Sequence, residues 1–316
     1  MADSYPVVTR DRPTFYFFGV TTGQSSSRRV FPAWMDVLGS DGQLVGVDLA
    51  LNAPADDYRA AVYQIKHDPL SYGALVTTHK INVLNAARDL FDELTEAARL
   101  CGEVSAIYKR DGRLIGHAVD PVTSARSMAQ FIPPGYWRQH NADIMCLGAG
   151  GSAVAITLHF LTSAAPEDRP RRLTVVNRTQ GKLDHLRGLV AGLPDSGITF
   201  EYVQNADPAA NDRIMADLPP YSMVINATGM GKDIPGSPVT DDGVFPENGI
   251  AWELNYRGAL EFMHQAARQT ESRNLTVVDG WYYFLQGWIT IIGHVFDIDI
   301  TPDLFDRLAE AAESIR

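Results

Sequence analysis

The most constraining feature of this 316-residue chain is a glycine turn that joins a buried strand to a helix. Met145, Cys146 and Leu147 lead into Gly148-Ala149-Gly150-Gly151, and residues 152–163 are apolar enough to pack on a sheet. A strand, a glycine turn and a helix in this order form the unit that places a pyrophosphate on a helix N-terminus. Such turns also occur for packing alone, so the interpretation needs a second feature.

The second feature is the end of the next predicted strand, where Asn177 and Arg178 follow Val175-Val176. Units that bind NAD usually carry Asp or Glu there for the ribose 2′-hydroxyl, and a carboxylate would repel a 2′-phosphate. A guanidinium attracts a phosphate, and Lys182 adds a cation one turn later. The sequence therefore predicts NADP and a redox reaction. The competing interpretation of Arg178 is an exposed strand-end charge, and Thr179 is a predicted helix N-cap under either.

Composition excludes several other classes of function. The chain is 45% hydrophobic and 21% charged, as in ordinary globular proteins, and its formal net charge is -11. An acidic chain is a poor partner for nucleic acid or an anionic membrane. Cys101 and Cys146 lie in apolar segments and are predicted to be buried thiols. No stretch approaches a membrane span and the N-terminus lacks a signal-peptide pattern, so we expect a cytoplasmic protein.

The alternation of strands and helices predicts an α/β fold in two domains. Asp111-Gly112 marks a β-hairpin in the first part of the chain, and Pro133-Pro134-Gly135 is a predicted hinge. From Ala142 the pattern restarts and predicts a parallel, doubly wound sheet. Strands are expected at 14–20, 44–51, 72–77, 105–109, 113–117, 142–147, 173–177, 199–204, 222–226, 250–255 and 275–278. Helices are expected at 30–38, 56–67, 80–100 with a break near 94–95, from Pro121 to before Pro133, at 152–163, and twice after Trp281.

Two ionisable residues stand where ligands gather in α/β proteins. Lys80 follows the strand at 72–77 at its carboxyl end, and Asp120 follows the second hairpin strand. Taken singly, Lys80 is more typical of a solvated first-turn lysine and Asp120 of a helix N-cap before Pro121. Together, a lysine and a carboxylate can supply the proton that a carbonyl needs when hydride transfer turns it into an alcohol. The hydroxyls of residues 25–27 could cap a helix or bind a carboxylate, and chemistry alone favours the cap.

A series of short blocks extends this pattern along nearly the whole chain. The blocks are Ser25-Ser26-Ser27 after Gly19, Gly73 to Lys80, Glu93 to Thr95, Gly102 to Ser105, Asp111 to Gly116 with Asp120, Gly148 to Gly151, Asn177 to Lys182, Ile225 to Gly231, and Asp279-Gly280 with Gln286. In this order they resemble the shikimate and quinate dehydrogenase family. The resemblance implies a substrate-binding catalytic domain (residues 1–120 with 283–316), a Rossmann-like NADP domain (121–282) and an interdomain cleft.

The family resemblance also implies the activity and the site residues. It implies reversible hydride transfer between NADP(H), with NAD as an alternative, and a ring hydroxyl or ketone of shikimate, 3-dehydroshikimate or a related cyclic polyol acid, as in aromatic amino acid biosynthesis. Lys80 would donate and accept the proton with Asp120 as its partner. Substrate would be held by Ser25, Ser27, Thr77, Ser105, Tyr256 and Gln286. NADP would be held by Gly148, Ala149, Gly150, Gly151, Ser152, Ala153, Asn177, Arg178, Thr179, Lys182, Thr228, Gly229, Met230 and Gly280.

Departures from the family pattern fall on the substrate side. The lysine block lacks a proline and is one residue short, as is the stretch from 279 to 286, and Arg28 replaces a proline. Leu75, Ser105 and Ala118-Val119 stand where the family has Asn, Asn and Asn-Thr. Because a site built to bond hydroxyls rejects analogues that leave its polar groups unpaired, these changes should alter which ring hydroxyls are tolerated. We expect a related cyclic polyol or hydroxy acid as substrate.

Three alternatives accompany this hypothesis. The first two are a quinate-type and an aminoshikimate-type dehydrogenase. The third is a redox sensor that binds NADP without turnover, which the presence of both Lys80 and Asp120 disfavours. In each case we expect a small-molecule ligand, no nucleic-acid or membrane partner, no metal, and a monomer or homodimer.

Overall fold

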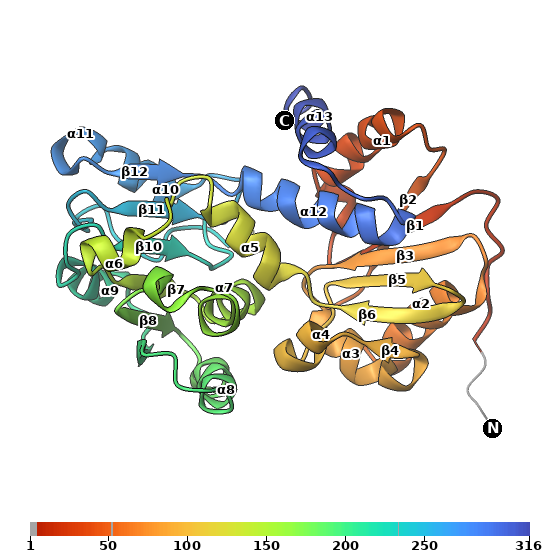
Figure 1. Ribbon diagram of the computed structural model, residues 1–316, viewed down its shortest axis with the longest axis horizontal. Coiled ribbons are helices and arrows are strands. Elements are labelled where there is room, and N and C mark those ends of the chain that lie inside the picture. Colours follow the sequence, from red (N-terminus) through yellow and green to blue (C-terminus); the bar gives the residue numbers. More distant parts are fainter. Residues whose placement is uncertain (1–4, 52, 233) are drawn as a thin grey trace. The chain divides into compact units, whose positions relative to one another are not determined.

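The structure, a computed structural model, describes residues 5–51, 53–232 and 234–316. The chain forms two compact units, Met1–Val119 with Gly287–Arg316 and Asp120–Gln286 (Figure 1). The predicted hinge at residues 133–135 is wrong, because this segment lies inside the second unit and the chain changes unit at Val119-Asp120. The signal-peptide prediction rests partly on residues 1–4, which lie outside the described residues.

The first unit is built on a mixed six-stranded sheet. Its strands are β1 (Thr14–Gly19), β2 (Gln43–Asp48), β3 (Ser71–Val76), β4 (Glu93–Leu94), β5 (Ala106–Arg110) and β6 (Arg113–His117), in the order β2-β1-β3-β5-β6-β4. β1 pairs in parallel with both β2 and β3, whereas β5 runs antiparallel to β3 and β6. The predicted hairpin is confirmed: Asp111 and Gly112 both have positive φ (51° and 74°), as its tight turn requires.

Helices surround this sheet. They are α1 (Ser27–Leu38), α2 (Ala55–His67), α3 (Lys80–Ala87), α4 (Glu96–Cys101), the later part of α12 (Trp281–Phe296) and α13 (Pro302–Glu313). The helical run predicted over 80–100 is wrong in its middle, since α3 ends at Ala87 and β4 lies between α3 and α4. The Asp92 main chain and side chain both bond the main chain of Leu114, which draws this segment onto β6. No helix within the described ranges has the length and apolarity that a membrane crossing needs.

The second unit carries an entirely parallel sheet. Its strands are β7 (Ile144–Leu147), β8 (Arg172–Asn177), β9 (Thr199–Gln204), β10 (Met223–Asn226), β11 (Ile250–Glu253) and β12 (Thr276–Val278), in the order β12-β11-β10-β7-β8-β9. The parallel, doubly wound sheet predicted from the sequence is therefore confirmed. The strand order reverses between β7 and β10, and ligands of such sheets bind beyond the carboxyl ends at this reversal.

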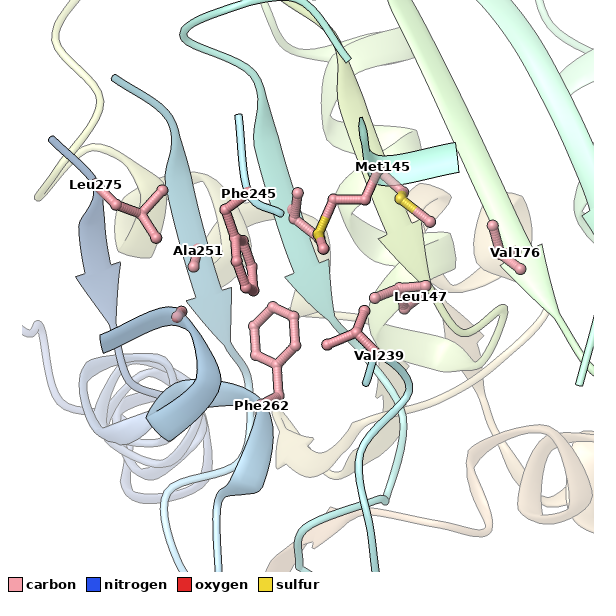
Figure 2. Packing of buried hydrophobic residues seen from close by; sticks show 11 residues of the cluster. Met145, Leu147, Val176, Val239, Phe245, Ala251, Phe262 and Leu275 are labelled. Carbon is pink, nitrogen blue, oxygen red and sulfur yellow. The ribbon is translucent and has the colours of Figure 1, made fainter. Parts of the chain in front are cut away.

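Helices and a buried apolar core hold these strands in place. The helices are α5 (Asp120–Met128), α6 (Tyr136–His140), α7 (Gly151–Thr162), α8 (Gln180–Ala191), α9 (Pro208–Ala216), α10 (Glu261–Ala267) and α11 (Thr270–Arg273). Figure 2 shows part of the core, where Leu147 of β7 and Ala251 of β11 lie near Phe245 and Phe262. The last two rings meet edge to face with centroids 5.5 Å apart. This packing fixes the strand ends from which the candidate site is built.

Candidate functional site

The glycine turn after β7 has the geometry of a phosphate cradle. Gly148 has a φ of +112°, and a Cβ there would lie 2.7 Å from the Ala227 carbonyl oxygen, so only glycine fits. Gly150 is the N-cap of α7, makes no side-chain cap and would carry a Cβ into open space. The first N–H groups of α7, from Gly151, Ser152 and Ala153, therefore lack a side-chain cap at a site open to an anion.

Asn177, at the end of β8, organises the turn from the neighbouring strand. Its Oδ1 accepts a hydrogen bond from the Ala149 N–H (3.3 Å), and its Nδ2 donates to the carbonyl oxygen (3.0 Å) and Oγ1 (2.8 Å) of Thr179. Thr179 stands at the N-cap of α8, but its side chain bonds Asn177 and no helix amide. Asn177 thus joins the glycine turn to the loop that carries Arg178.

Two cations flank the start of α8. Arg178 and Lys182 are both exposed. Asp184, the nearest carboxylate along the helix, pairs instead with Arg187 at 2.7 Å. Among the residues that the structure describes, no carboxylate lies within 4.0 Å of Arg178 or Lys182. With the uncapped glycine turn, this cationic surface fits the pyrophosphate and 2′-phosphate of NADP.

Buried polar side chains hold the loop after β10. Asn226 Oδ1 accepts from the Thr228 N–H (3.1 Å) and Oγ1 (2.6 Å), and Thr228 Oγ1 in turn accepts from the Met230 N–H (3.1 Å). Asn255 Nδ2 donates to the carbonyl oxygens of Thr228 (3.2 Å) and Met230 (3.1 Å). The loop from Thr228 through Gly229 to Met230 is therefore fixed before any ligand binds.

Glu253, which ends β11, supports the same loop. Its side chain is fully buried; Oε2 accepts from Asn226 Nδ2 at 2.7 Å and Oε1 from the Asn255 N–H at 2.8 Å. Burial raises the pKa of the Glu253 carboxyl to about 7, although the bonds from Asn255 and Asn226 oppose the shift. The site predictions omitted Asn226, Glu253 and Asn255. The only signal for them was polar residues at the ends of apolar strands.

Three further predicted residues lie near the start of α12. A Cβ at Gly280 would lie 2.1 Å from the Leu254 carbonyl oxygen, so this contact requires glycine. The Tyr256 ring packs against Phe284 of α12 with centroids 4.4 Å apart. Gln286 is buried: its Nε2 donates to the Tyr282 hydroxyl (3.0 Å), and its Oε1 has no hydrogen-bond partner within the described residues. An amide oxygen in that state is suited to a ligand hydroxyl.

In the first unit, three predicted substrate residues gather where β1 and β3 end. Ser25 Oγ accepts from the Ser27 N–H (3.3 Å) and Oγ (2.8 Å), just before and within the start of α1. Thr77 Oγ1 donates to the Phe18 carbonyl oxygen at 2.8 Å. A Cβ at Gly19 would lie 3.2 Å from Thr77 Oγ1, so the loop after β1 passes close to this threonine.

His79 accounts for the shortened lysine block. It is buried, its Nε2 lies 3.0 Å from the Leu49 carbonyl oxygen, and its Nδ1 lies 3.1 Å from the Tyr58 hydroxyl. Because a carbonyl only accepts, Nε2 carries the proton of that bond. These bonds tie the residue before Lys80 to two neighbouring segments. They secure the start of α3 where the family pattern has a proline.

Lys80 begins α3 at the same carboxyl edge and meets a carboxylate that the site predictions omitted. Its Nζ lies 3.8 Å from Oε1 of Glu103, and Glu103 is 3% exposed. Ser105, two residues later, is buried, and its Oγ accepts the Val119 N–H at 2.9 Å. Ser105 therefore holds the segment that leads to Asp120. Asp120 begins α5 and the second unit and is 8% exposed, and its pairing with Lys80 stays a prediction.

Comparisons with known proteins identify relatives of one activity. No family model matches the chain. A relative from Rhodospirillum rubrum named shikimate dehydrogenase (NADP+) is 30% identical over 214 residues, covering 67% of this chain and 68% of that enzyme. One of the same name from Lactococcus lactis is 27% identical over 179 residues. That alignment covers 56% of this chain and less than two thirds (59%) of the relative.

Solved structures match the fold over almost the full length. Shikimate dehydrogenase from Thermus thermophilus, in complex with NADP(H) and shikimate, is 20% identical with a TM-score of 0.68, covering 96% of this chain and 99% of its partner in the case of the next structure and 95% or more here. That next structure, ligand-free 5-ketofructose reductase of Gluconobacter, is also 20% identical with a TM-score of 0.68. At such identity these structures establish the fold alone.

Proposed function

This chain belongs to the shikimate dehydrogenase family, and we propose that it is an NADP-dependent alcohol dehydrogenase acting on a ring hydroxyl or ketone. The observation that carries the proposal is the placement of Lys80 at a carboxyl edge that also holds Ser25, Ser27 and Thr77. An ammonium beside hydroxyl groups can bind a hydroxy acid and exchange a proton with its carbinol oxygen.

The second unit would hold the cofactor. Residues 148–153 would bind the pyrophosphate, Arg178, Thr179 and Lys182 the 2′-phosphate, and residues 228–230 with Gly280 the nicotinamide end. When bound, NADP supplies or accepts the hydride. Asn177, Asn226, Glu253 and Asn255 act on this chemistry only by fixing the loops that touch the cofactor.

The first unit would hold the substrate and move its proton. Ser25, Ser27 and Thr77 would bind a carboxylate or hydroxyl, with Ser105, Tyr256 and Gln286 as further contacts. Lys80 would give the proton to the carbonyl oxygen in reduction and take it from the hydroxyl in oxidation, with Asp120 as its partner. We further propose a cytoplasmic enzyme that is a monomer or homodimer.

The substrate proposed is a relative of shikimate. Leu75 is 5% exposed and Ala118 fully buried, so the two positions where the family has Asn offer no polar side-chain atom. Ser105, at the third, already accepts a main-chain N–H. Fewer polar groups recognise ring hydroxyls, which favours a cyclic polyol or hydroxy acid with a different hydroxyl pattern. Quinate and aminoshikimate are the first alternatives, and 5-ketofructose, the substrate in the name of one structural relative, is a fourth candidate.

A substrate panel with a lysine variant tests the proposal. Shikimate, quinate, aminoshikimate, 3-dehydroshikimate and 5-ketofructose are assayed with NADP+ or NADPH by the absorbance of the reduced nicotinamide. Lys80→Met keeps the aliphatic chain and removes the ammonium, so turnover should fall at least about 100-fold while NADPH binding, followed by fluorescence, stays close to wild type. Wild-type turnover in Lys80→Met would refute the proton-transfer role. Tight NADPH binding with no turnover on any substrate would favour the sensor.

A further inference from the structure

Glu103 is a buried carboxylate placed beside the proposed proton-transfer residue. It lies between α4 and β5, is 3% exposed, and brings Oε1 within 3.8 Å of Lys80 Nζ. The Lys80 side chain is itself 16% exposed. The next residue, Val104, donates its N–H to the Lys80 carbonyl oxygen at 3.3 Å. The main chain and the ion pair therefore hold the same two segments together.

This arrangement is costly unless it serves Lys80. Removing a carboxylate and an ammonium from water costs more than a separated pair regains, so a buried ion pair is weak evidence for a stabilising role. A nearby carboxylate does favour the charged form of a lysine. The ammonium has three donors, and a pair at 3.8 Å is longer than a hydrogen bond, so a substrate oxygen can still be bound.

We propose that Glu103 is a positioning residue that keeps Lys80 in its ammonium form and aims it at the substrate, so that Lys80 enters the reaction as a proton donor. This inference rests on the proposed function. In the favoured direction the substrate carbonyl carbon gains a hydride from NADPH and its oxygen gains a proton from Lys80. The products are the alcohol, NADP+ and a neutral Lys80 amine, which solvent reprotonates. Ketone reduction is therefore the direction that runs well at neutral pH, and alcohol oxidation requires alkaline solution.

The other ionisable groups around the start of α3 have different bonds. His79 and Tyr58 of α2 bond each other, and His79 also bonds the Leu49 carbonyl oxygen. Arg59 of α2 pairs with Asp89 just beyond the far end of α3.

The segments before Glu103 and beside it carry further ionisable groups. His117 of β6 bonds Thr95, and Cys101 of α4 is buried. On α4, Glu96 and Arg99 are exposed. Asp120, in the other unit, is the partner that the family resemblance implies for the same lysine. Of these carboxylates, Glu103 is the one whose ion pair with Lys80 lies within the first unit.

The test compares three versions of the full-length protein and one control. Glu103→Gln removes the charge at nearly constant volume, and Glu103→Asp keeps the charge but draws it back by one methylene. Glu96→Gln removes an exposed carboxylate from α4 and serves as the control. Two quantities are measured against pH: the rates of reduction and oxidation with NADP(H), and the rate at which acetic anhydride labels Lys80, read by peptide mass spectrometry.

The labelling rate reports the free amine of Lys80 whether or not the enzyme turns over. In Glu103→Gln we expect Lys80 to label about tenfold faster at neutral pH, because loss of the carboxylate moves the titration of the lysine by about one unit to lower pH. Both rate profiles should move in the same direction, and Glu103→Asp should lie between wild type and Glu103→Gln. Glu96→Gln should match wild type.

The outcomes separate the two proposals. If wild type is active and Glu103→Gln and Glu103→Asp leave the labelling and both profiles unchanged, the role of Glu103 is refuted and the proposed function stands. A loss of stability without a change in Lys80 labelling refutes it equally, because that is what a merely structural residue would show. If wild type turns over no substrate, the proposed function fails whatever the labelling shows.

Discussion

The buried carboxyl of Glu253 predicts that the protein loses stability as pH rises toward neutrality. Its pKa is raised from 4.5 to about 7, chiefly by burial. Between these values the folded chain keeps a proton that the unfolded chain has released. Since stability rises with pH only where the unfolded state binds more protons, this group makes stability fall across the window and adds nothing further above it.

The size of the effect follows from the shift. The folded and unfolded pKa values, about 7 and 4.5, differ by about 2.5 units, and each unit corresponds to ~1.4 kcal/mol. The charged side chain therefore costs the folded state about 3 kcal/mol once pH exceeds both values. Domains of ordinary size are stable by only about 5–15 kcal/mol, so the loss is a large fraction of the total.

A glutamine variant isolates this contribution from every other titrating group. Glu253→Gln cannot ionise; its Oε1 can still accept the Asn255 N–H, but its NH2 then faces the Asn226 Nδ2 donor. That mismatch should destabilise the variant by about 1–3 kcal/mol at every pH. The free energy of unfolding in urea, followed by tryptophan fluorescence, is measured for both proteins from about pH 5 to about pH 8.

The quantity that decides is the stability of wild type minus that of the variant. It should fall by about 2.5 kcal/mol between about pH 5 and about pH 8, because part of the loss has already occurred at the lower value. Groups that titrate identically in both proteins cancel in the difference. A difference that stays constant across this range would show that Glu253 keeps an ordinary carboxyl pKa, and the account of the loop after β10 would be wrong.

Two further predictions concern the cofactor side. Arg178→Ala should weaken NADP binding at least about tenfold more than NAD binding, measured by titration calorimetry, because it removes a charge-assisted bond to the 2′-phosphate; Arg187→Ala, on the exposed face of the same helix, is the control, and equal losses for both cofactors would contradict the assignment. Gly148→Ala should lower the free energy of unfolding by at least about 2 kcal/mol, because of its φ of +112° and the contact with Ala227. Gly150→Ala should leave stability close to wild type and weaken cofactor binding, since its Cβ enters open space; equal stability of the two variants would refute the distinction.

The sequence predicted those parts of the fold that local patterns determine. Apolar strands alternating with amphipathic helices located the predicted strands of both sheets to within a few residues, and the glycine turn at Gly148 located the strand-order reversal of the second sheet. The two-residue strand β4 was missed, because it depends on the bonds between Asp92 and Leu114 rather than on a periodic pattern. The hinge was misplaced because proline and glycine mark a loop whether or not it joins two units.

The candidate site divides in the same way. Residues that act through main-chain conformation, such as Gly148 and Gly280, are visible in a sequence because only glycine fits their contacts. Residues that act through distant side chains are not: Glu253 bonds Asn226 across 27 positions, and Glu103 meets Lys80 only once α3 and β5 are packed. A glutamate in an apolar stretch gives no sign of its partner until the fold brings the two together.

These long-range pairs bear on what the substrate must look like. Where the family pattern has neutral amides, this chain has the apolar Leu75 and Ala118, and it adds the buried carboxylate of Glu103 beside Lys80. An amide both donates and accepts, whereas a carboxylate only accepts. A site changed in this way loses donors for substrate oxygens and keeps an acceptor for hydroxyl groups. It should therefore favour a compound whose hydroxyls donate toward Glu103 and whose carbonyl faces Lys80, which is the arrangement of a keto polyol.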